Sequence, residues 1–360
     1  MRHVSGSSQP PLSVQGAWPQ PRTGEVQNKQ NGSQTNKPLA GLARKLRENE
    51  VIAWLMLSLF RALQRIGINI TPNHFYWPIP DVAELETRDW PVRMPSEAFD
   101  FRLGRQVELL LKIAADYRIE WNFPEKSGDG SSVYHYNNGF FESVDAEIAY
   151  SLVRLFKPTR IIEIGTGFST RVLAAALQAN LEKDRTAGEL ISIDPMPERL
   201  PQNGFSDLVT VLPRRVQDVD LGIFRSLGPN DILFIDSSHV VATGSDVVRE
   251  FLEILPTLRP GVLVHVHDIF LPSDYPREAV LKNMCFWSEQ YMLQAFLSFN
   301  SSFEVIWTSS AMQSFRRDLL DTVFPRWRFS YKAIPRSQRR WVPSIDKQRT
   351  WPSSFWLRRI

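Results

Sequence analysis

Two pairs of ionisable residues stand directly after short apolar runs of the kind that form buried strands. Asp236 and His239 follow the run 232–235, and His267 and Asp268 follow the run 262–266. Because the carboxyl ends of neighbouring parallel strands meet at one rim of a sheet, these four side chains are expected to lie together. Imidazole and carboxylate groups can take a proton from a hydroxyl, or they can hold a divalent cation such as Mg²⁺ or Mn²⁺. Asp236, His239 and His267 are therefore the candidate catalytic residues.

A glycine-containing turn follows another apolar run. Residues 160–164 lead into Gly165-Thr166-Gly167, and a helical pattern begins directly afterwards. Glycines let a ligand approach the backbone closely, and the N–H groups of the following helix then face that ligand. The next predicted strand ends at Asp194, whose carboxylate can accept both hydroxyls of a ribose. The two strand ends together predict a nucleoside ligand, the alternative for Asp194 being a turn that leads into Pro195.

The elements that position these residues follow a repeating strand–helix pattern beyond residue 145. Strands are predicted at 160–164, 190–193, 208–212, 232–235, 262–266 and 303–308, and helices at 170–180, 219–227, 245–255 and 282–299. Short apolar runs of this kind lie in parallel sheets that are covered on both faces. The pattern predicts an α/β fold, a Rossmann-like, doubly wound and mostly parallel sheet with a helical N-terminal extension and a basic C-terminal tail.

Composition and charge exclude several classes of protein. With 43% hydrophobic and 22% charged residues the chain is not wholly disordered, and a single cysteine excludes a disulfide framework or a Cys-rich zinc site. A reducing, cytoplasmic compartment is the expected location. The net charge is +3, yet residues 326–360 hold ten Lys and Arg against one Asp, so the rest of the chain is acidic and no nucleic-acid partner is expected.

The glycine motif resembles a known family. Glu163-Ile164-Gly165-Thr166-Gly167, followed by Asp194, is similar to the cofactor half of the class I S-adenosylmethionine-dependent methyltransferases, over roughly residues 143–309. The resemblance implies that Gly165 and Gly167 lie against the methionine end of S-adenosylmethionine. It further implies that Glu163 helps to hold the amino group of the cofactor and that Asp194 binds its ribose.

Two further cofactor contacts follow from the same resemblance. Ser169 stands where many members have a third glycine, at the start of the helix, and this exchange is compatible with a helix N-terminus. Asp218, after the third strand, is the candidate for a residue near the adenine.

The polar rim resembles metal-dependent O-methyltransferases, especially those that act on sugar hydroxyls of macrolides. In that group an Asp-x-x-His after the fourth strand and an acidic pair after the fifth form the site. The resemblance implies that Asp236 and Asp268 are metal ligands and that His239 is the general base. His267 stands where the first acid of the pair would be and is a third candidate ligand.

These features predict a methyltransferase that acts on a hydroxyl of a small molecule or glycan, in particular a saccharide or a glycosylated metabolite. Aromatic residues in 269–276 and 287–291 are candidate acceptor contacts. The alternatives are a metal-independent enzyme of the same fold with His239 as base, and a non-catalytic cofactor-binding scaffold that acts through its aromatic N-terminal region and basic tail. A purely structural role for the histidines, with His239 capping the following helix and His265 and His267 satisfied within their strand, is a further alternative. A nicotinamide dehydrogenase would need the complete glycine fingerprint, which is missing.

Four regions are expected along the chain. Residues 1–40 form a disordered segment, 41–142 a helical and aromatic cap region, 143–325 the S-adenosylmethionine-binding domain, and 326–360 a basic tail rich in Trp. The apolar run 51–60 is too short to span a bilayer and forms either a packed helix or an interfacial one. The tail is either a solvated extension or a peripheral contact with an anionic membrane. The sequence carries no signal for a particular oligomeric state.

Overall fold

A computed structural model describes residues 50–71, 73, 78–90, 97, 99–126, 133–197 and 207–360. The disorder predicted for residues 1–40 lies outside these residues. The chain divides into two compact units, residues 1–72 and 73–360. The first contains α2 (Glu50–Arg65), which includes the apolar run 51–60, and its leucines Leu55, Leu57 and Leu59 are exposed. No helix in the described ranges is long and apolar enough to cross a bilayer.

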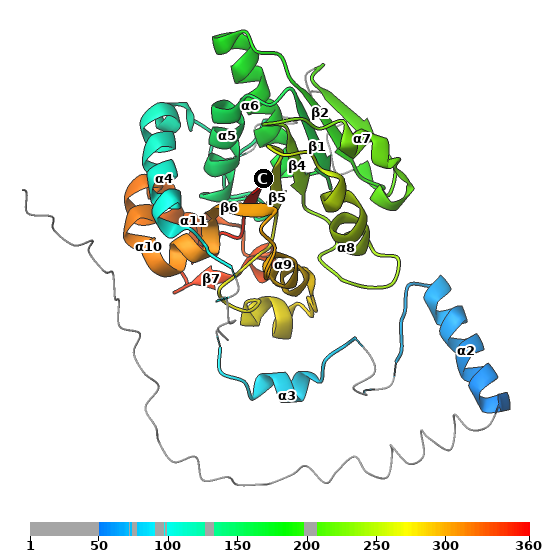
Figure 1. Ribbon diagram of the computed structural model, residues 1–360. Coiled ribbons are helices and arrows are strands. Elements are labelled where there is room, and N and C mark those ends of the chain that lie inside the picture. Colours follow the sequence, from blue (N-terminus) through cyan, green and yellow to red (C-terminus); the bar gives the residue numbers. More distant parts are fainter. Residues whose placement is uncertain are drawn as a thin grey trace, which may run out of the picture. The chain divides into compact units, whose positions relative to one another are not determined.

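The second unit is built on a seven-stranded sheet with the order β3-β2-β1-β4-β5-β9-β6 (Figure 1). The first five strands are parallel, and β9 runs antiparallel between β5 and β6. The strands are β1 (Arg160–Ile164), β2 (Glu189–Ile193), β3 (Val209–Leu212), β4 (Ile232–Ile235), β5 (Leu263–Val266), β6 (Phe303–Thr308) and β9 (Phe355–Arg359), with a separate small ribbon of β7 (Ser344–Ile345) and β8 (Arg349–Thr350). The predicted α/β, mostly parallel sheet is confirmed, and the six predicted strands agree with the observed bounds to within one residue.

Helices cover both faces of this sheet, as the apolar β-branched strands require (Figure 1). One face is covered by α4 (Leu103–Tyr117), α5 (Asp145–Phe156), α6 (Phe168–Asp184) and α10 (Ser309–Val323), and the other by α7 (Leu221–Arg225), α8 (Asp246–Arg249) with its π-helical continuation Glu250–Ile254, and α9 (Glu289–Leu297). Alternate strand residues enter the two cores: Phe234 faces the first, whereas Leu233 and Ile235 face the second. The short helices α3 (Val82–Glu86) and α11 (Ser330–Ala333) complete the unit.

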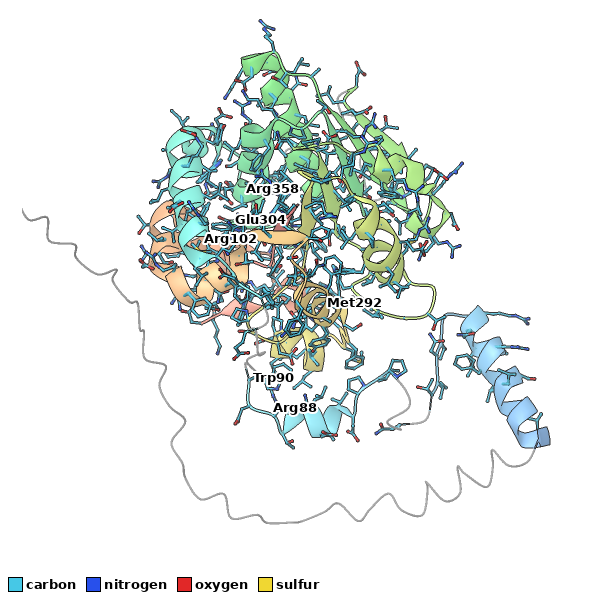
Figure 2. The ribbon with its side chains drawn as sticks, viewed as in Figure 1. Arg88, Trp90, Arg102, Met292, Glu304 and Arg358 are labelled. Atoms are coloured by element: carbon cyan, nitrogen blue, oxygen red, sulfur yellow. The ribbon has the colours of Figure 1, made fainter. Side chains whose placement is uncertain are left out.

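The region 41–142 is not a single cap. Leu110 and Ile113 of α4 are fully buried in the first core, so this helix is part of the α/β unit. An ion pair between Arg102, at the start of α4, and Glu304 of β6 ties the helix to the sheet (Figure 2). An amphipathic pattern alone does not indicate which surface the apolar face of such a helix covers.

The prediction of a C-terminal tail outside the core is wrong. β9 is an interior strand, and its Phe355, Trp356 and Leu357 are at most 1% exposed. Trp327 is fully buried as well, and Arg349 pairs with Asp321 at 3.0 Å. Arg326 likewise pairs with Glu125 at 2.9 Å, and the three apolar residues of β9 lie inside the sheet between β5 and β6. The net charge of residues 326–360 is strongly positive, and this average does not reveal the short apolar run in β9.

Candidate active site

The carboxyl ends of β1, β2 and β4 open onto a cavity of about 940 Å³. β1 pairs with β2 on one side and with β4 on the other, so the cavity lies at the point where the strand order reverses. Its lining includes the predicted residues Gly165, Gly167, Ser169, Asp194, Asp236, His239, His267 and Asp268. The fold thus brings eight of the predicted site residues to one cavity, and Glu163 and Asp218 are not among those that line it.

The glycine turn allows β1 and β4 to approach each other closely. Gly165 has a φ of +92°, and a Cβ at this position would lie 2.1 Å from the carbonyl oxygen of Asp236. A side chain is therefore excluded here on both conformational and steric grounds. Gly167 ends the turn, its N–H donates to Thr170 Oγ1 at 2.9 Å, and α6 begins at the next residue. The start of this helix faces the cavity and offers N–H groups to a ligand.

Glu163 lies beneath the turn, not in the cavity. It is fully buried and accepts hydrogen bonds from the hydroxyls of Ser169 (2.8 Å), Thr170 (2.7 Å) and Ser192. Burial raises the pKa of Glu163 to about 7, although these three hydroxyls act in the opposite direction. Glu163 is fully buried and does not line the cavity, so its observed role is to hold the start of α6 and β2 beneath the glycine turn.

The two other acids predicted to bind the nucleoside differ in their positions. Asp194 lines the cavity and accepts from both the N–H (3.0 Å) and the hydroxyl (2.6 Å) of Thr166. Each carboxylate oxygen has two acceptor sites, so Asp194 can still bind a ligand. Asp218 is exposed and pairs with Arg215, and its neighbours Val216 and Gln217 line the cavity instead. The sequence predicted the correct segment after β3, but the side chain of Asp218 does not line the cavity.

The four polar residues of the rim form a cluster around His239. The Nε2 atom of His239 lies 3.5 Å from Asp236 Oδ1 and 3.5 Å from Asp268 Oδ2, and its Nδ1 atom lies 2.8 Å from Glu289 Oε2. Glu289 is 1% exposed and was not predicted as a partner, since it is fifty residues away in the chain. His239 and Asp268 both have positive φ angles, 62° and 54°, which non-glycine residues rarely adopt.

The charges of the cluster determine its protonation. Burial alone would lower the pKa of His239, but the carboxylates of Asp236 and Glu289 raise it well above the ordinary value. Burial likewise opposes ionisation of Asp236, yet the neighbouring His267 and His239 lower its pKa to about 2. At neutral pH the structure therefore holds a protonated His239 beside an ionised Asp236. The predicted general base must release its proton before it can accept another.

The residues at the rim do not fit a metal ion in this arrangement. Within the described ranges, no group of three or more His, Cys, Asp or Glu side chains is placed to hold one. The reason lies in His239, whose imidazole stands between the carboxylates of Asp236 and Asp268, where a shared cation would have to lie. His267 Nε2 is 3.9 Å from the nearest oxygen of Asp268. The predicted ligand set of Asp236, His267 and Asp268 is thus brought together but not arranged as ligands.

The two strand histidines of β5 and its end have different surroundings. His265 is fully buried, its Nε2 lies 2.9 Å from Ser354 Oγ, and its ring stacks on Phe234 at 3.7 Å. Burial lowers the pKa of His265 well below its ordinary value, so it is a neutral packing residue. His267 lies at the cavity, and its Nδ1 is buried without a hydrogen-bond partner in the described part of the chain. This nitrogen is enclosed by protein, so His267 lines the cavity through other atoms of its ring.

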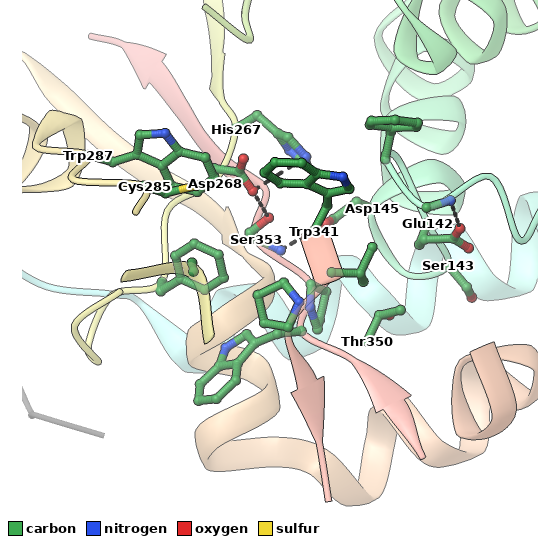
Figure 3. Close-up of a pocket in the computed structure, with 18 residues that line it drawn as sticks. Glu142, Ser143, Asp145, His267, Asp268, Cys285, Trp287, Trp341, Thr350 and Ser353 are labelled. Atoms are coloured by element: carbon green, nitrogen blue, oxygen red, sulfur yellow. Dashed lines mark hydrogen bonds and ion pairs between the residues drawn. The ribbon is translucent and has the colours of Figure 1, made fainter. Parts of the chain in front are cut away.

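A second pocket of about 220 Å³ adjoins the first cavity. The two share Phe140, His267, Asp268 and Trp287 as lining residues. The C-terminal segment supplies one wall of this pocket with Trp341, Val342, Pro343, Thr350, Trp351, Pro352 and Ser353 (Figure 3). Of the aromatic segments predicted to contact an acceptor, Phe270 and Trp287 line the pocket, while the rest of 269–276 is buried.

Comparison with known proteins places the chain in a family. Residues 162–269 match a family described as a methyltransferase domain. An uncharacterized protein of Archaeoglobus fulgidus is 31% identical over 176 residues, which cover 47% of this chain and 78% of that protein. The chain belongs to the class I methyltransferases, as the order of its sheet and the glycine turn at β1 also indicate. It is a methyltransferase enzyme that uses S-adenosylmethionine, and the scaffold and dehydrogenase alternatives are not supported.

Solved structures show a more distant likeness. The O-methyltransferase TomG from Streptomyces achromogenes, in complex with S-adenosylmethionine, is 23% identical; the match covers 62% of this chain and 86% of that one, with a TM-score of 0.32. An O-methyltransferase from Bacillus cereus is 18% identical, over 56% and 81% of the two chains, with a TM-score of 0.30. At these scores nothing about the acceptor or the mechanism of this protein follows from the likeness.

Proposed function

We propose that this protein transfers the methyl group of S-adenosylmethionine to a hydroxyl oxygen of a small molecule, with His239 as the general base. The observation that carries this proposal is the position of His239, which lines the large cavity and whose Nδ1 is bonded to Glu289. Its Nε2 lies 3.5 Å from Asp268, a residue that lines both the large cavity and the smaller pocket. A cofactor in the first and an acceptor in the second would bring the sulfonium methyl and the hydroxyl together at this junction.

The reaction balances with the residues present. The hydroxyl oxygen attacks the methyl carbon, the carbon–sulfur bond breaks, and its electron pair remains on sulfur to give S-adenosylhomocysteine. The hydroxyl proton passes to Nε2 of His239, and the proton on Nδ1 stays in the hydrogen bond to Glu289. Because the sulfonium is already an activated leaving group, alignment of the acceptor supplies much of the remaining acceleration.

Cofactor binding prepares the base for this step. The free protein holds His239 in its protonated form because carboxylates surround it. A bound sulfonium adds a fixed positive charge to the same cavity, and a nearby like charge disfavours the imidazolium. A bound sulfonium would therefore lower the pKa of His239 and favour its neutral form, in which Nε2 can accept the hydroxyl proton.

The pH dependence of the reaction tests this role. Because His239 must be neutral to act, kcat/KM is expected to rise with pH and to level off only above the ordinary histidine pKa of about 6.5. Replacing Glu289 by Gln removes one of the carboxylates that raise this pKa, so the rising limb moves to lower pH. A profile that falls with pH, or one that Glu289→Gln leaves in place, would contradict the assignment of His239.

The activity itself is tested with S-adenosylmethionine and a mixed panel of phenols and methyl glycosides, with methylated products detected by mass. The panel includes saccharides because the sequence predicts such an acceptor. His239→Asn is expected to lose nearly all turnover while retaining S-adenosylhomocysteine binding, and Asp218→Asn is the matched control outside the cavity. Turnover that persists in EDTA supports the metal-independent mechanism, and turnover that requires Mg²⁺ or Mn²⁺ would restore the predicted metal site.

A further inference from the structure

The smaller pocket limits the size of the acceptor group that can reach the junction. Its volume of about 220 Å³ is below the roughly 300–1,000 Å³ of pockets that hold drug-sized ligands. It therefore holds about one ring with its substituents. The wall formed by the C-terminal segment closes it on the side away from the cofactor cavity, because Trp341 to Pro343 and Thr350 to Ser353 line only this pocket.

Aromatic side chains dominate the lining. Figure 3 shows Trp287 and Cys285 near Asp268, with Trp341 near His267. Phe270 and Trp351 add two more aromatic faces to the same pocket. Aromatic rings favour offset-stacked and edge-to-face contacts with one another. A planar aromatic ring bound here would bury apolar surface and could make such contacts with the lining.

The polar groups of the lining are largely used by the protein itself. Glu142 accepts from the backbone N–H groups of Asn137 and Gly139, at 3.1 and 2.6 Å. The carboxylate of Asp145 accepts from the N–H groups of Ser353 and Ser354, at 2.8 and 3.1 Å. The hydroxyls of Ser143 and Thr350 are bonded to Glu147 and Ser330. The remaining acceptor site on each of these carboxylate oxygens is shared with a backbone N–H, so a saccharide hydroxyl would have to compete for it, and any hydroxyl buried without a partner costs about 1–3 kcal/mol.

The polar groups that remain are gathered at one end of the pocket. Asp268 lines both cavities, and its Oδ1 accepts from Ser353 Oγ at 3.0 Å. His267 lines both cavities beside it. This end thus offers a carboxylate oxygen to a hydroxyl, and aromatic side chains form much of the remaining wall.

We propose that this pocket binds a monocyclic aromatic ring carrying the hydroxyl that is methylated, and that Trp341 of the C-terminal segment determines this specificity. The proposal rests on the proposed function for the fate of the hydroxyl. It replaces the predicted saccharide with a phenol-class acceptor. Trp341 is 46% exposed, so it lies at the mouth of the pocket and can be replaced without opening the core.

Cys285 provides a direct readout of pocket occupancy. It is the single cysteine of the chain, it lines the pocket, and it is partly exposed. Alkylation of the full-length protein by N-ethylmaleimide therefore gives one adduct, which intact-protein mass spectrometry follows over time. A ligand at about twice its Kd leaves about one third of the pocket free and slows this labelling about threefold.

The experiment compares resorcinol, 1,3-cyclohexanediol and methyl glucopyranoside, each in the presence of S-adenosylhomocysteine. Resorcinol is expected to slow the labelling of Cys285 saturably, at concentrations where the non-planar diol and the glucoside have no effect. Trp341→Ala is expected to remove this protection without changing the affinity for S-adenosylhomocysteine. Phe299→Ala is the control, because Phe299 is 94% exposed and does not line the pocket. This variant is expected to retain the protection of Cys285 by resorcinol.

Three results would overturn the proposal: equal protection by the diol or the glucoside, no protection by resorcinol, or protection that survives Trp341→Ala. Calorimetric titration with S-adenosylhomocysteine distinguishes failure of the aromatic-ring proposal from failure of the proposed function. If the cofactor product fails to bind while resorcinol still protects Cys285, the proposed function is wrong and the aromatic specificity of the pocket stands.

Discussion

Replacing Glu163 by Gln changes how stability depends on pH, by an amount that the structure fixes. The carboxyl is fully buried, and burial raises its pKa from 4.5 to about 7. The folded protein therefore holds this proton more tightly than the unfolded chain. The free energy of unfolding contributed by Glu163 is thus greatest below pH 4.5 and falls as the pH rises to about 7. Since each pKa unit corresponds to 1.36 kcal/mol, the whole fall is about 3 kcal/mol.

Gln cannot ionise, so the variant lacks this slope. Between pH 5 and pH 8 the difference in unfolding free energy between Glu163→Gln and the wild type should move by about 2.5 kcal/mol in favour of the variant. Reversible urea unfolding at the two pH values measures this difference, and the titration of all other groups cancels in it to first order.

Glu142 is the matched control for this experiment. Burial raises its pKa to about 7 as well, but it lines the smaller pocket instead of supporting the glycine turn. Glu142→Gln should therefore show a similar change with pH, while only Glu163→Gln weakens the binding of S-adenosylhomocysteine. Parallel stability curves for Glu163→Gln and the wild type would refute the account of Glu163 as a buried carboxyl that is neutral below pH 7.

Three further changes test the fold and the cofactor cavity. Gly165→Ala should lower the free energy of unfolding by at least about 2 kcal/mol, because of its positive φ and the clash with Asp236. Gly167→Ala, which has open space around its Cβ, should cost less than about 1 kcal/mol in the same urea titration. Asp194→Asn should weaken S-adenosylhomocysteine binding roughly 10- to 100-fold in calorimetry, and an unchanged Kd would remove this residue from the site. Deleting β9 removes three buried side chains worth about 5–9 kcal/mol, comparable with the whole stability of a domain, so near-ultraviolet circular dichroism should show loss of tertiary structure.

The parallel sheet and its functional rim could be predicted from local sequence. Each strand from β1 to β6 is a short run of mostly apolar residues, and turn residues mark where the run ends. This pattern depends only on neighbours in the chain. The rule that ligands bind at the carboxyl ends of such strands then selected Gly165, Asp194, Asp236 and Asp268, all of which line the cavity. Nothing about tertiary contacts was needed for this step.

The direction in which each side chain points could not be predicted in the same way. Glu163 is on β1 and Asp218 ends a short 3₁₀ helix that follows β3, but the first lies under the glycine turn among three hydroxyls and the second pairs with Arg215 on the surface. A shift of one residue along an extended backbone reverses the face on which a side chain lies. Strand ends placed to within a residue therefore identify the rim but not every residue in it.

What the sequence alone determined is the class of fold, the glycine turn and the set of polar residues at the rim, because these follow from local patterns. The tertiary structure decided how those residues are charged and what encloses them. His239 gains Glu289 from fifty residues away, and Asp268 gains Ser353 from eighty-five residues away, so their protonation and orientation depend on the folded chain. The C-terminal segment, basic when read along the sequence, becomes a strand and a pocket wall only because a gap between β5 and β6 accepts its three apolar residues.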